Sequence, residues 1–150
     1  MALRVVLLLS ILCAALVLVP AGAHLMSLPN KIGMSGPDYL VAQRAYDGWS
    51  MSAIAVIAAL VSTGAFAWLA RRDSDVFTLA VVAFACMVAT QVVFWTLNFP
   101  GNQQTANWTR LPGNWESLRW RWEIGHATSC VLNLGALLAL LAANWRLLRH

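Results

Sequence analysis

Long apolar stretches alternate with more polar segments along this chain. Four of them are long enough to cross about 30 Å of hydrocarbon, which takes about 20 helical residues. They occupy positions 5–26, 49–70, 76–97 and 122–143, the last within a helix expected over 115–146. Inside a bilayer each must be a helix, because only a helix satisfies the backbone hydrogen bonds of a single segment. The pattern therefore predicts one all-α domain, an integral membrane four-helix bundle.

The connections between the predicted helices differ in length. The second is a tight hairpin at 71–75 that makes its flanking helices antiparallel, and the other two, counted between apolar stretches, each exceed 20 residues. Both long loops are thus predicted on the side opposite the hairpin and the termini. Lys and Arg number five on each side, so the positive-inside rule is evenly balanced. Because Arg4 precedes the first apolar run and the hairpin holds Arg71 and Arg72, we expect cytoplasmic termini and non-cytoplasmic loops, in a bacterial inner membrane.

The first apolar stretch has a second interpretation. Ala21, Gly22 and Ala23 resemble the cleavage site of a signal peptide, and cleavage would make His24 the new N-terminus. The stretch is long for a signal, however, and its removal would leave one face of the bundle uncovered. We therefore expect the first helix to be retained.

Composition supports a membrane protein and narrows its partners. Hydrophobic residues make up 60% of the 150 and charged residues 11%, whereas soluble domains have about 45–50% and about 25%. The net charge of +4 includes no basic run, so nucleic acid is not an expected partner. The expected partners are membrane lipid and a small lipophilic substrate. A homo-oligomer is also possible. Three cysteines without a CxxC spacing are expected to be buried thiols rather than a redox pair: Cys13, Cys86 and Cys130.

Polar residues in the last helix form a stripe. Steps of four and three residues place five of them on one face: Arg119, Glu123, His126, Cys130 and Asn133. Ionisable groups are costly inside a membrane and mark functional sites, so we expect this face to point into the bundle. His24 lies at a similar depth in the first helix. The two imidazoles are predicted to meet in an interior pocket near the outer surface.

The chemistry of this predicted pocket has several interpretations. Two imidazoles and one carboxylate can hold mononuclear non-haem iron, and copper accepts two imidazoles equally well, which would make His24, His126 and Glu123 a metal-binding set. Alternatively, His126 acts as an acid or base without a metal, or the histidines are only hydrogen-bonded in the interior. In the outer loop, the amides that begin at Asn98, together with Trp108, are candidates to line a pocket for an aromatic ligand that carries a carbonyl group.

Two motifs resemble those of the anthrone-oxygenase-like family of small four-helix membrane proteins. The first is Asn98-x-Pro100-x-Asn102 followed by Trp108, and the second runs from Asn114-Trp115-Glu116 through Trp122-Glu123 to His126. The resemblance implies an O2-dependent membrane oxidoreductase, a monooxygenase acting on a lipophilic phenolic or quinone-like substrate. It also implies functional roles at Asn98, Asn102, Arg119, Trp122 and His126.

Together, these observations predict two groups of site residues. The predicted catalytic residues are His126, His24, Arg119 and Glu123, and the predicted substrate-binding residues are Asn98, Asn102, Trp108 and Trp122. The cofactor is unknown and would be mononuclear iron, copper or none. A non-enzymatic membrane protein, either an accessory subunit or a ligand-binding protein, is the alternative, and its polar stripe would only set the helix register.

Overall fold

The computed structural model describes residues 1–149 and contains only helices and their connections within that range. In chain order the elements are α1 (Ala2–Lys31), α2 (Gly36–Gln43), η1 (Arg44–Tyr46), η2 (Trp49–Met51), α3 (Ser52–Ala70), α4 (Ser74–Val93), η3 (Phe94–Asn98), α5 (Phe99–Gln104) and α6 (Trp115–Leu148). Four helical segments are long and apolar enough to cross a membrane: Ala2–Lys31, Trp49–Ala70, Ser74–Gln104 and Trp115–Leu148. The predicted all-α membrane bundle is confirmed.

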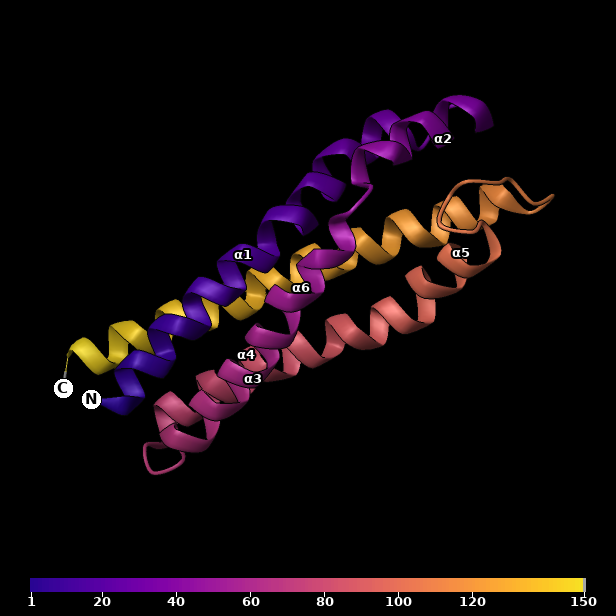
Figure 1. Cartoon of the computed structure of the whole chain (residues 1–150). Coiled ribbons are helices and arrows are strands. Elements are labelled where there is room, and N and C mark those ends of the chain that lie inside the picture. Colours follow the sequence, from indigo (N-terminus) through magenta and orange to yellow (C-terminus); the bar gives the residue numbers. More distant parts are fainter. Residues whose placement is uncertain (150) are drawn as a thin grey trace.

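The four long helices form a closed ring of neighbours. α1 packs against α3 and α6, and α4 packs against the same two helices. Both termini and the α3–α4 hairpin lie at one end of the bundle, whereas α2, α5 and the loop before α6 lie at the other (Figure 1). At the first end, Arg4 donates a hydrogen bond to the Leu147 carbonyl oxygen, and Arg146 pairs with Asp75. The two long connections therefore lie opposite the hairpin, as predicted.

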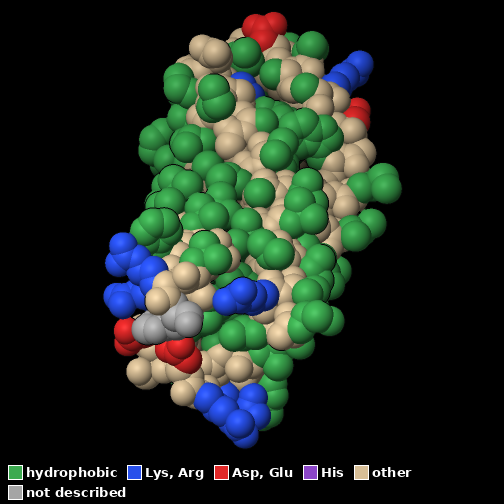
Figure 2. Space-filling model, turned by 90° about the vertical axis from the view of Figure 1, so that its left-hand side faces the viewer, with side chains coloured by type: hydrophobic (Ala, Val, Ile, Leu, Met, Phe, Trp, Pro, Cys, Tyr) green, Lys and Arg blue, Asp and Glu red, His purple; other side chains and the backbone are tan. Residues whose placement is uncertain are grey.

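The surface and the core both fit a lipid environment. Charged side chains gather toward the two ends of the face in Figure 2, and a broad hydrophobic band separates them. Small residues such as Ala14, Ala59, Ala80 and Ala136 fill much of the core between the helices. Because lipid gives apolar side chains little reason to cluster, membrane helices associate through close backbone packing, which small residues permit.

Two helices are longer than predicted. The first continues past the predicted end at residue 26 to Lys31, with Pro20 and Pro29 inside it, and residues 21–23 lie within its continuous helix. The third does not end at residue 97. A π-helical turn, η3, joins α4 to α5, and Pro100 occupies the first turn of α5, where a missing backbone N–H costs little. Much of both long connections is therefore helical.

Gly125 marks a close approach of α6 to η3. A Cβ added there would lie 2.6 Å from Oδ1 and 2.8 Å from Nδ2 of Asn98. The Asn98 side chain is buried and donates a hydrogen bond of 2.8 Å to the Trp122 carbonyl oxygen. Only glycine leaves room for this bond.

We predict that Gly125→Ala destabilises the protein by about 1–3 kcal/mol, because overpacking forces Asn98 to move. Unfolding of the purified protein in mild detergent measures the change. Gly22→Ala is the matched control, since an added Cβ in α1 would meet nothing within 4 Å. Equal stability of the two variants would contradict the close approach.

Candidate functional site

The imidazoles of the first and last spanning helices lie against each other. The rings of His24 on α1 and His126 on α6 stack, with centroids 4.0 Å apart and planes 20° apart. His24 is buried, whereas His126 is partly exposed to a cavity. Tertiary packing thus brings together two residues separated by about 100 positions in the chain.

Aromatic rings surround the histidine pair. Trp122 meets His126 edge-on at 4.2 Å, and Tyr46 lies 4.2 Å from His24, with Trp49 at 5.7 Å. The hydroxyl of Tyr46 shares a hydrogen bond of 2.8 Å with that of Ser27. Tyr46, Trp49 and Trp122 thus form an aromatic wall built from η1, η2 and α6, and Ser27 of α1 holds Tyr46 in place.

Beside the histidines lies a cavity of about 570 Å³, within the usual range for small-molecule sites. Val17, Ala53 and Val56 are among its apolar lining residues. Its other lining residues include the aromatic wall and several amides: Tyr46, Trp49, Trp108, Trp122, Gln43, Gln91, Asn98, Asn102, Asn107 and Asn133. The arrangement suits a flat, largely apolar molecule with a few polar atoms.

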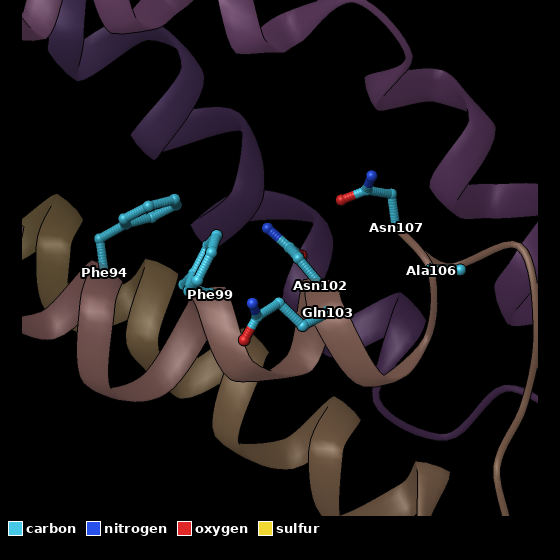
Figure 3. A pocket seen from close by; sticks show the side chains of 6 residues that line it. All are labelled: Phe94, Phe99, Asn102, Gln103, Ala106 and Asn107. Atoms are coloured by element: carbon cyan, nitrogen blue, oxygen red, sulfur yellow. The ribbon is translucent and has the colours of Figure 1, made fainter.

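A second pocket of about 410 Å³ opens beside the first. Phe94 and Phe99 stand next to each other along its helical side, and Asn107 leans toward Asn102 from the loop (Figure 3). Phe94, Asn102 and Asn107 line both pockets. The two spaces are therefore neighbours that share a wall.

The loop after α5 carries unusual backbone geometry. Ala106, Asn107 and Trp108 have φ values of 49°, 55° and 60°, a left-handed region that costs non-glycine residues about 1–3 kcal/mol each. Thr105 supports the turn, because its hydroxyl accepts a hydrogen bond of 3.0 Å from the Trp108 backbone N–H. This turn sets Asn107 and Trp108 on the outer wall of the cavity.

A buried ion pair lies next to the aromatic wall. Lys31 Nζ is 2.9 Å from Glu123 Oε1, and the two side chains are 4% and 0% exposed. Lys31 Nζ also lies 4.6 Å from the ring centroid of Tyr46 and 5.3 Å from that of Trp122. Such cation–π contacts help to offset the loss of water around the ammonium group.

Tyr39 extends this pair into the connection between α1 and α3. Its hydroxyl donates a hydrogen bond of 2.9 Å to Glu123 Oε1 and accepts one from Gln43 Nε2. Burial raises the pKa of the Tyr39 phenol far above its usual range, and the Glu123 carboxylate raises it further. Tyr39 therefore remains a protonated donor to Glu123 at every physiological pH.

Arg119 contacts the same connection and not Glu123. It donates a hydrogen bond of 2.7 Å to the Met34 carbonyl oxygen, and its guanidinium carbon lies 4.7 Å from the Trp115 ring centroid. Neither Arg119 nor Glu123 is among the residues that line the cavity. Both therefore hold the surrounding structure, whereas the predicted catalytic residues His24 and His126 line the cavity itself.

The predicted metal-binding set of His24, His126 and Glu123 is not assembled. Among residues 1–149, no three His, Cys, Asp or Glu side chains are grouped closely enough to hold an ion. Two imidazoles that bind one ion must point their in-plane lone pairs at a common point, about 2.0–2.1 Å from each nitrogen. Stacked rings direct those lone pairs nearly side by side, and Glu123 is engaged by Lys31 and Tyr39.

The four predicted substrate-binding residues all line the cavity. Three of them also form hydrogen bonds that join neighbouring elements of its wall. Asn98 donates to the Trp122 carbonyl oxygen, and Trp122 Nε1 donates a hydrogen bond of 2.8 Å to Asn102 Oδ1. Trp108 packs edge-on against Trp122, with ring centroids 5.8 Å apart. These residues therefore hold α6 against η3 and α5, whatever the cavity binds.

Sequence reasoning missed several residues of this site. The sequence leaves Lys31 two roles, as a cap for the His24 site or as a lipid contact, and nothing in the pattern singles out Tyr39 or Gln43. The signal that could have found Lys31 is a cation placed seven residues after His24, on the same face of one helix. No signal of this kind marks Tyr39, because its role depends on how α2 folds back.

Comparison with models of known families, with curated proteins and with solved structures gives no match. The likeness to the anthrone-oxygenase-like family therefore rests on the motif residues alone.

We predict that Lys31→Met and Glu123→Gln each destabilise the protein, the former by about 3–5 kcal/mol because it leaves a buried carboxylate unpaired. The double variant Lys31→Met/Glu123→Leu should recover most of that loss. Unfolding in mild detergent measures both. Asp75→Asn is the control: it breaks the exposed Arg146–Asp75 pair and should cost under about 1 kcal/mol. Additive losses in the double variant would argue against a coupled pair.

Proposed function

We propose that this protein is a membrane oxidoreductase that oxidises a lipophilic phenolic or quinone-like molecule with O2. The observation that supports this most directly is the stacked His24–His126 pair at the wall of an aromatic cavity. The cavity accepts a flat apolar ring system, and its amides accept or donate hydrogen bonds to carbonyl and phenol groups. The motif resemblance points to the same substrate class.

The chemistry follows from a base placed beside an acidic C–H group. In an anthrone-like substrate, His126 would accept a proton from the ring methylene, which leaves an enolate. The Asn107 amide, on the cavity wall, would stabilise the developing negative charge. The enolate then reacts with O2: one oxygen atom becomes the new carbonyl oxygen, and the other leaves as water with the two hydrogens of the methylene. His24 positions the His126 ring by stacking.

A non-enzymatic ligand-binding protein is the second candidate. The cavity supports it equally, because a pocket with aromatic walls binds ligands whether or not a reaction follows. Buried polar contacts such as Asn98 to Trp122 would then serve only to hold the helices in register. Turnover, rather than binding, distinguishes the two candidates.

We also propose that both termini face the cytoplasm of a bacterial inner membrane. At the loop end, Lys31 is buried in its ion pair and Arg119 is half-buried. The exposed basic residues there are Arg44, Arg110 and Arg121. All five at the opposite end are exposed: Arg4, Arg71, Arg72, Arg146 and Arg149. The balance of free positive charge thus favours the terminal end as cytoplasmic.

We predict that His126→Ala lowers the O2-dependent oxidation of anthrone by about 10²–10⁴-fold, the usual contribution of a general base. Oxygen uptake by protein in lipid nanodiscs, corrected for the uncatalysed reaction, measures this. Thr128→Ala, at an exposed position outside the cavity, should leave the rate unchanged. Ligand binding without any turnover by the natural protein would favour the non-enzymatic candidate.

A labelling experiment tests the orientation. In a protein whose three cysteines are replaced by alanine, we expect Thr109→Cys in the outer loop to react with a membrane-impermeant maleimide added to intact bacterial cells. Ser74→Cys in the hairpin should react only after the cells are opened. The reverse labelling pattern would place the termini outside.

A further inference from the structure

The cavity continues past the histidines toward the middle of the bundle. Ser129 and Asn133 follow His126 at three and seven positions along α6, on the same face, and both line the cavity. Gln91 lines it from α4. At 1.5 Å per residue, Asn133 lies about 10 Å deeper than His126. A polar inner end therefore exists where the surrounding helices are otherwise apolar.

This inner end has unused hydrogen-bonding capacity. Asn133 is 3% exposed, and its Oδ1 is buried without a hydrogen-bond partner among the described residues. The Gln91 amide donates to the Thr90 hydroxyl at 3.1 Å, a contact within α4 that joins no other helix. An unpaired amide inside a membrane protein costs free energy unless something satisfies it. No hydrogen bond joins the Gln91 amide of α4 to the Asn133 amide of α6.

The outer end has a matching feature. Trp108 is 5% exposed and lines the cavity, and its indole Nε1 is buried without a partner among the described residues. An indole N–H only donates, so its partner must be an acceptor such as a carbonyl or phenolate oxygen. Trp108 packs against Trp122, and Trp122 precedes Asn133 by eleven residues, or about 16 Å along the helix. Aromatic rings fill the wall between the two polar ends.

We propose that the cavity recognises a rigid planar ligand with a polar group at each end of its long axis. One end carries an oxygen that accepts a hydrogen bond at Trp108, and the other carries a hydroxyl that bonds to Asn133 and Gln91. An amide serves a hydroxyl well because it both donates and accepts. This inference rests on the proposed function for the identity of the ring system. It adds that the ring system must carry a polar group at both ends of its long axis.

Two probes that differ in one group test the inference. Both are anthraquinones: the two-ended probe carries a hydroxyl at each end of its long axis, and the one-ended probe carries a hydroxyl at one end only. Quenching of tryptophan fluorescence measures their affinity, because Trp108 and Trp122 line the cavity. The natural protein should bind the two-ended probe at least about tenfold more tightly, since a site built to bond a hydroxyl discriminates against ligands that lack it.

Asn133→Leu should abolish this preference by weakening the two-ended probe about tenfold, while the one-ended probe binds as before. Gln91→Met, on a different helix, should reduce the preference in the same way and covers the case in which the first variant fails to fold. Asn144→Leu is the matched control, because Asn144 lies on the same helix outside the cavity. It should keep the natural preference.

Three results would overturn the inference: no preference in the natural protein, a preference that survives both variants, or an equal loss of both probes. A natural protein that binds neither probe counts as showing no preference. The same result is expected if water alone satisfies Asn133. Failure of the proposed function looks different. In that case the preference persists, in the natural protein and in His126→Ala, but no oxygen is consumed.

Discussion

The end of the bundle opposite the termini depends on an ammonium and a carboxylate that have almost no contact with solvent. Lys31 ends α1, Glu123 lies on α6, and Tyr39 of α2 donates to the same carboxylate oxygen. Either charge alone would be costly at this position, so the two must stay together. Their contact therefore joins three elements and fixes the side of the cavity that α2 and η1 cover.

Around this contact, several buried polar groups of the bundle are paired with one another. Asn98, Asn102 and Trp122 satisfy one another between η3, α5 and α6. Of the buried side-chain atoms without a hydrogen-bond partner among the described residues, Trp108 Nε1, His24 Nδ1 and Asn133 Oδ1 belong to residues that line the cavity, whereas Arg119 Nε and Glu123 Oε2 do not. Unpaired polar groups are rare in a structural core, so the three at the cavity are available to form hydrogen bonds with a molecule that occupies it.

The family-like motif has a structural explanation as well as a proposed chemical one. Asn98 needs the space beside Gly125 and bonds the backbone of Trp122, while Asn102 bonds the indole of the same tryptophan. Trp122 in turn packs against His126. These residues therefore fix the position of the His126 ring even if none of them touches a substrate.

The sequence alone determined the number of spans, the placement of both long connections at the end opposite the hairpin and the inward stripe of α6. Hydrocarbon imposes helix length and burial on each segment separately. The sequence also suggested that His24 and His126 lie at one depth. Only the tertiary structure decided that their rings stack rather than bind a common metal ion, and that Glu123 pairs with Lys31. Those outcomes depend on how α1 packs against α6, because His24 and Lys31 lie on α1 and their partners lie on α6. A periodic pattern along one helix carries no information about which side chain of another helix will pair with a buried charge.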